Sequence, residues 1–208
     1  MKKTILLSLM LLILKFSNVN AAIITTDWNN VGDSFITRDT TSGLNWLDLT
    51  VTGGMSYNDV FAELMLESSE LYGYRFATSD EVISLWEQFG INLDFGVRNI
   101  VTPTTPGVEI ASSFLGNVVG AESPDYTGSI GMIFTDWRSH SVNSAGAFNF
   151  EGSSFLEGIG IRGSSFDTGV NFMGSYLVSP SPVPLPASIW LIFSGLIALF
   201  SFTRNKHP

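Results

Sequence analysis

The sequence contains no cysteine. This absence excludes disulfide bonds, thiolate metal sites and cysteine nucleophiles. A folded domain in this chain must therefore be stabilised by its own hydrophobic core. The roughly 165 residues between the two apolar termini are enough for one domain with such a core.

Basic residues are also scarce. Between Ala22 and Pro186 the sequence has five arginines, no lysine and all 19 of its carboxylates, a balance of about −14. A surface with this charge repels nucleic acid and anionic lipid headgroups, so we expect no nucleic-acid partner. The negative charge can serve solubility alone, or it can attract divalent cations or basic partners.

Patterns typical of catalysis or metal binding are few. His140 is the only histidine of this region, so a Ser-His-Asp triad or a two-histidine metal site would have to be built around it. The sequence therefore predicts a non-enzymatic protein without a cofactor, and a hydrolase is the less favoured alternative. The segment from Asp27 to Asp33 offers several oxygen ligands and leaves calcium as a minor alternative, although it lacks EF-hand spacing.

The N-terminus has the three parts of a secretory signal peptide. Met1-Lys2-Lys3 is a positive segment, residues 5–14 are apolar, and small residues follow near Ala21. We expect a signal peptide over residues 1–21, with signal peptidase cleaving after Ala21 or Ala22. An uncleaved N-terminal anchor is the alternative.

The C-terminus combines a proline-rich segment, an apolar segment and a basic end. Residues 180–186 predict a stiff linker, because Pro184 and Pro186 fix φ and lack the amide donor. Residues 187–203 carry no charge and are slightly short of the ~20 needed to span a bilayer upright, so we expect one transmembrane helix. Arg204 and Lys206 in the tail, residues 204–208, predict a cytoplasmic C-terminus and an outward-facing domain. A plain C-terminal anchor and a buried core helix are the alternatives.

This tail resembles the PEP-CTERM sorting domain of Gram-negative bacteria. Val183, Pro184, Pro186, Ala187 and Ser188 match its proline motif, Trp190 with Ser194-Gly195-Leu196 matches its helix, and Arg204 with Lys206 matches its basic cluster. Leu185 stands where the family has glutamate, and the resulting V-P-L-P-A form is similar to a recognised variant.

The resemblance implies export through the inner membrane, transient membrane anchoring and processing by an exosortase-type enzyme. The mature protein would then reside at the cell surface or in an extracellular polysaccharide matrix such as a biofilm. We therefore expect a structural or adhesive role.

The region between the tags, residues 22–179, predicts one α+β domain. Ser56 with Asp59 and Thr78 with Glu81 form capping-box patterns, which predict helices over residues 57–69 and from residue 79 to Gly90. A third, shorter helix is expected over residues 107–115. Strands are expected at residues 33–38, 44–47, 129–135, 145–151 and 171–178. Helices followed by alternating strands favour two or three helices packed on a twisted antiparallel sheet.

The same region resembles a domain common in PEP-CTERM proteins and, more distantly, bacterial domains thought to be C-type-lectin-like. The resemblance rests on Gly43-Leu44-Asn45-Trp46, on Ser56 to Val60, on Gly73 to Thr78 with Glu81, and on Tyr176-Leu177-Val178. Tyr-Arg-Phe-Ala stands where those domains have Trp-Arg-Leu-Pro. The resemblance implies a compact helix-and-sheet fold and, by analogy of fold alone, a sugar or protein ligand.

One loop is a candidate ligand contact. Asp136, Trp137, Arg138 and His140 lie close to a predicted strand end and could line a groove for a polysaccharide, which makes a carbohydrate-binding module the alternative function. The competing interpretation is a solvated loop with Trp137 packed on the sheet. Trp46 and Trp86 lie on apolar faces, so we expect them in the core rather than in a sugar site.

Overall fold

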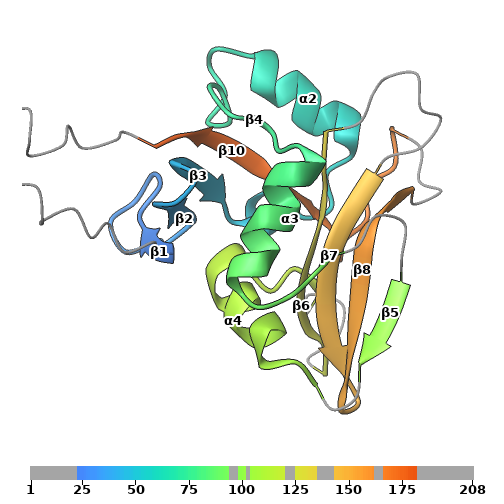
Figure 1. Ribbon diagram of the computed structural model, residues 1–208. Coiled ribbons are helices and arrows are strands. Elements are labelled where there is room, and N and C mark those ends of the chain that lie inside the picture. Colours follow the sequence, from blue (N-terminus) through green and yellow to red (C-terminus); the bar gives the residue numbers. More distant parts are fainter. Residues whose placement is uncertain are drawn as a thin grey trace, which may run out of the picture.

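The computed structural model describes residues 23–93, 98–101, 104–119, 125–134, 143–161 and 166–181 (Figure 1). This part of the chain forms an α+β domain with three α-helices and two five-stranded sheets. The predicted fold class is confirmed at this level. The predicted signal peptide and transmembrane helix lie outside the described residues. Among the helices that are described, none has the length and apolar character needed to cross a membrane.

The first sheet has the strand order β1-β2-β3-β10-β4, and all its pairs are antiparallel. Its strands are β1 (Ile23–Thr26), β2 (Ile36–Asp39), β3 (Leu44–Leu47), β10 (Leu177–Pro180) and β4 (Arg75–Phe76). β1 and β4 are therefore the two edge strands. A 3-10 turn, η1 (Leu49–Thr52), follows β3.

The second sheet has the order β5-β8-β7-β6-β9. β9 (Gly174–Ser175) is parallel to β6 (Thr127–Met132), and the remaining pairs are antiparallel. The other strands are β5 (Arg98–Val101), β7 (Asn143–Phe150) and β8 (Ser153–Ile161). Our expectation of a single sheet was wrong, because β9 and β10 join different sheets on either side of Tyr176.

The three helices follow the local sequence signals. α2 (Tyr57–Met65) and α3 (Ser79–Gln88) each begin with a complete capping box, at Ser56 and Thr78. α4 (Pro106–Leu115) begins with proline in its first turn and packs on β6 and β7. α2 ends four residues earlier than predicted, because Leu66 adopts an extended conformation. The serines that follow form a turn in which Ser69 Oγ accepts the Leu71 amide.

The core is centred on the segment that passes from one sheet to the other. Tyr176 is buried between β9 and β10, and its ring meets Trp46 edge-on with centroids 6.2 Å apart. Trp86 of α3 donates a hydrogen bond from Nε1 to Tyr176 Oη at 2.9 Å. The Tyr176 carbonyl accepts the Ala77 amide and its own amide donates to the Met132 carbonyl. One residue thus connects both sheets to α3, and Trp46 and Trp86 are core residues as predicted.

Candidate functional site: an apolar groove beside β4

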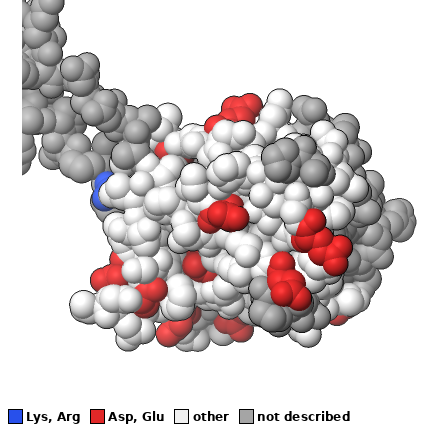
Figure 2. All heavy atoms as spheres, turned by 90° about the horizontal axis from the view of Figure 1, so that it is seen from below, with Lys and Arg blue, Asp and Glu red and all other residues white. Residues whose placement is uncertain are grey.

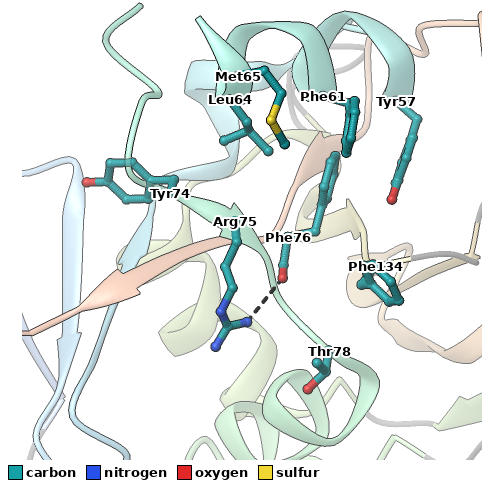
Figure 3. A pocket seen from close by; sticks show the side chains of 9 residues that line it. All are labelled: Tyr57, Phe61, Leu64, Met65, Tyr74, Arg75, Phe76, Thr78 and Phe134. Atoms are coloured by element: carbon teal, nitrogen blue, oxygen red, sulfur yellow. Dashed lines mark hydrogen bonds between the residues drawn. The ribbon is translucent and has the colours of Figure 1, made fainter. Parts of the chain in front are cut away.

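A groove of about 360 Å³ lies between α2 and the edge strand β4 (Figure 3). α2 forms one wall, and β4 with the residues beside it forms the other. Phe134, two residues after the end of β6, closes the groove. The lining residues are Tyr57, Phe61, Leu64, Met65, Tyr74, Arg75, Phe76, Thr78 and Phe134.

The base of the groove is fixed by aromatic packing. Tyr57 stacks on Phe76 with ring centroids 4.3 Å apart and an interplanar angle of 11°. Phe166 meets Tyr57 edge-on at 5.2 Å. Both rings of the stacked pair are buried, so the base of the groove is preformed.

The rim, in contrast, exposes apolar side chains. Phe61 is 47 % exposed, Met65 is 64 % exposed and Phe134 is 58 % exposed. All three line one concave site, which distinguishes them from single apolar residues scattered over a surface. Apolar groups gathered in this way mark a surface where a ligand or partner removes area from water.

The charged part of the lining is already neutralised. Arg75 donates from its two terminal nitrogens to Glu81 at 2.6 and 2.8 Å. The same carboxylate accepts the Thr78 amide at 2.8 Å, which completes the cap of α3. The bonds from Arg75 are the main cause that lowers the pKa of Glu81 to about 2, and Glu81 in turn raises the pKa of Arg75. Arg75 therefore presents little unbalanced charge to a ligand.

The hydroxyls of Tyr74 and Thr78 in the groove are also engaged. Burial raises the pKa of the Tyr74 hydroxyl, although its hydrogen bond with Ser179 partly opposes this effect. The Thr78 hydroxyl lies 3.1 Å from Glu81. A sugar site needs polar groups that are available to hydroxyls, whereas this lining offers mainly apolar surface. Its chemistry suits binding of an apolar group.

The loop considered for calcium is organised by its own backbone. The Asp33 carboxylate accepts the amides of Trp28, Asn29, Asn30 and Phe35 at 2.8 to 3.2 Å. Desolvation opposes these bonds, but together they keep the pKa of Asp33 below its usual value. The carboxylate oxygens are thus directed at amide groups. Across the described parts of the chain, no group of three metal-binding side chains is found.

The predicted functional residues and the observed groove differ. Asp136, Trp137, Arg138 and His140 lie outside the described residues, as do Ala21, Ala22 and the sorting residues Val183, Pro184, Pro186, Ala187, Ser188, Arg204 and Lys206. The structure brings none of these predicted residues into a described site.

Sequence reasoning missed the groove. Phe61 belongs to the apolar set of α2, yet the structure leaves it half exposed at the rim. The available signal was Met65, four residues after Phe61, which makes the apolar stripe of α2 wider than one core contact requires. Phe134 gave no such signal, because its approach to β4 depends on the bond from its amide to the Ala77 carbonyl.

No protein family matches this chain, and no characterised protein or solved structure matches it either. The molecule is therefore classed by its own features. It is an α+β domain with two sheets joined at Tyr176 and an apolar groove beside an edge strand.

Proposed function

We propose that this chain is an exported, non-enzymatic protein that is sorted by its C-terminal tail to the cell surface or extracellular matrix, where its domain acts in adhesion or structure. The tail, the N-terminal signal sequence and the acidic exported region support export and sorting. The groove beside β4 supports a role in contact with another molecule.

The observation that carries the adhesive role is the exposed apolar rim. Phe61, Met65 and Phe134 surround a preformed base in which the rings of Tyr57 and Phe76 are buried. Leaving such a set in water forgoes roughly 25 cal/mol for each Å² that a partner would cover. A partner molecule is therefore the function that these residues fit best.

The positions of the described chain ends are compatible with attachment to a membrane. β1 and the C-terminal end of β10 lie on the same side of the molecule, and the second sheet lies on the other side (Figure 1). The Ser181 amide bonds to the Gly43 carbonyl, which holds the last described residue beside the β2–β3 turn. A tail leaving at this point keeps the second sheet away from the attachment.

Two variants in the producing bacterium test the proposal. A chain that ends at residue 182 loses the sorting tail, and we expect it to be lost from the surface of intact cells, as measured by antibody labelling. Phe61→Ser should stay on the surface at the wild-type level but reduce cell adhesion to matrix.

Ile110→Ser is the matched control for the second variant, because Ile110 lies on α4 outside the groove and is exposed to a similar extent. Unchanged surface labelling of the shortened chain would contradict sorting by the tail. Equal adhesion by the wild type, Phe61→Ser and Ile110→Ser would contradict the role of the groove.

A further inference from the structure

The groove lies beside an open sheet edge. β4 ends the order of the first sheet, and within the described parts of the chain it pairs there with β10 alone. The Ala77 amide donates across the ladder to Tyr176, so the preceding residue, Phe76, directs its backbone groups away from β10. The Phe76 carbonyl accepts a 3.2 Å bond from Arg75, whose side chain is 53 % exposed (Figure 3). Among the described residues, the Arg75 side chain bonds to this edge and no further strand pairs with it.

The chain segment that builds the groove is strongly acidic. Residues 57–81 contain six carboxylates, one arginine and no lysine. The arginine is Arg75, which is already paired with Glu81. The carboxylates are Asp59, Glu63, Glu67, Glu70, Asp80 and Glu81. Carboxylates also spread over the face shown in Figure 2, where basic side chains are sparse.

We propose that the groove binds an extended polypeptide segment in which apolar and basic residues alternate. The segment adds to the outer edge of β4 through Phe76, and one apolar side chain enters between Phe61 and Phe134. Its basic side chains face the carboxylates of residues 57–81. This inference rests on the proposed function of the groove as a contact site and names the partner's chemistry.

Charge and polarity distinguish this partner from the others. A second copy of the chain carries the same excess of carboxylates over arginines, so the two surfaces repel each other. Nucleic acid is repelled for the same reason. A neutral glycan finds Arg75 and Thr78 engaged with Glu81, and Tyr74 engaged with Ser179. A basic, apolar peptide satisfies the edge, the groove and the charge together.

The test uses the full chain in nanodiscs of neutral lipid and a fluorescent peptide, acetyl-Lys-Val-Lys-Phe-Lys-Val-Lys-amide, with empty nanodiscs as blank. Fluorescence polarisation should show saturable binding. The same peptide with glutamate in place of every lysine should bind at least about tenfold more weakly. Raising NaCl from about 50 to about 500 mM should weaken binding of the basic peptide severalfold. Equal affinity for the basic and acidic peptides would overturn the proposal.

Variants locate the binding. Phe61→Ser and Phe134→Ser should each weaken binding about tenfold, because each removes apolar area that the peptide covers. Ile110→Ser should leave the affinity within about twofold. Because Phe61 and Phe134 are half exposed, both variants should fold, and their thermal melting checks this. Wild-type affinity in both groove variants would overturn the location.

Hydrogen exchange tests the strand addition itself. The Phe76 amide should exchange at least about tenfold more slowly when the peptide is bound. Unchanged exchange with retained binding would overturn the edge placement. Saturable binding of a neutral glucan oligosaccharide that is lost in Phe61→Ser would overturn the peptide as occupant. If no peptide binds but Phe61→Ser still reduces cell adhesion, this inference fails and the proposed function remains.

Discussion

The two sheets of this domain achieve close packing in different ways. The first sheet buries large side chains, and Trp46, Trp86 and Tyr176 meet at its centre. The second sheet turns small residues such as Ala145 and Ala147 toward α4. The packing of the first sheet therefore depends on large side chains and buried hydrogen bonds. The packing of the second sheet depends on close approach of backbones.

The aromatic residues of the second sheet follow the same division. Phe148 and Phe150 alternate with the small residues along β7, so they lie on the opposite face. Phe148 stacks on Phe155 at 5.0 Å, and Phe150 stacks on Tyr126 at 4.3 Å. These rings pair across strands with each other instead of filling the space beneath α4. Stability in the two halves should accordingly respond to different substitutions.

The largest loss of stability is expected from adding a methyl group at Gly174, where the second sheet lies close to the backbone of Leu49. A Cβ at Gly174 would lie 2.1 Å from the carbonyl oxygen of Leu49. Gly174→Ala should lower the free energy of unfolding by about 3 kcal/mol or prevent folding, because backbone atoms must move. Urea denaturation measures the change.

Gly152→Ala is the control for crowding. This residue has φ +76° and open space around its Cβ position, so the cost should be about 1 kcal/mol from backbone strain alone. Equal losses for both variants would mean that the close approach contributes nothing.

The next effect concerns the first sheet and its buried hydrogen bond. Tyr176→Phe keeps the ring but removes the acceptor of Trp86 Nε1, which is buried. The free energy of unfolding should fall by about 1–3 kcal/mol, the usual cost of an unsatisfied buried donor. Tyr72→Phe, at an exposed tyrosine, should change it by less than about 0.5 kcal/mol in the same urea experiment. If Tyr176→Phe left the free energy of unfolding unchanged, the packing of the ring and not its hydrogen bond with Trp86 would be what stabilises the core here.

A third, smaller effect depends on pH. The folded-state pKa of Glu81, about 2, is below its usual value of 4.5. The stability that the ionised Glu81 side chain adds to the folded state is therefore complete above the unfolded-state pKa. It is lost as the pH falls through the folded-state pKa. Glu81→Gln should cost about 1 kcal/mol at pH 7, since the pair is partly solvent-screened and the cap is weakened. The difference from wild type should shrink between about pH 5 and pH 2.

Thermal unfolding as a function of pH checks this prediction. Glu70→Gln removes a carboxylate from an exposed turn and should have an effect below about 0.5 kcal/mol at each pH. A Glu81→Gln deficit that stays constant down to pH 2 would contradict the ion pair as its source.

The smallest effect is a stabilisation of the second sheet. Glu151 and Gly152 form the two-residue connection between β7 and β8, and both have positive φ, +48° and +76°. Asparagine adopts this conformation more readily than glutamate in such hairpins. Glu151→Asn should raise the free energy of unfolding by about 0.5 kcal/mol. A loss of stability in urea denaturation would contradict this turn geometry.

The comparison of the sheets also explains which features the sequence predicts. The helix starts at Ser56 and Thr78 were predicted correctly because a capping box is a signal within four residues. β3 was predicted to the residue, since a turn at Gly43 precedes an apolar run. These signals concentrate in the half that packs large side chains.

Long-range pairing was not predicted. Alternation along residues 171–178 indicated a strand, but only the structure divides it at Tyr176 between two sheets. The strands β1, β4, β5 and β8 were missed, because edge position, short length or glycine content weakens the alternating pattern. The groove was missed because it also depends on a long-range contact. Phe134 approaches β4 from a distant part of the chain.

Radical footprinting in intact producing cells would test the central claim, that the groove beside β4 is the contact site. Hydroxyl radicals label exposed Phe61 and Met65 in the purified full chain, and Ile110 provides an exposed reference outside the groove. We predict that labelling of Phe61 and Met65 falls severalfold in cells surrounded by their matrix, while labelling of Ile110 is unchanged. Equal labelling of the groove in cells and in the purified protein would contradict the account.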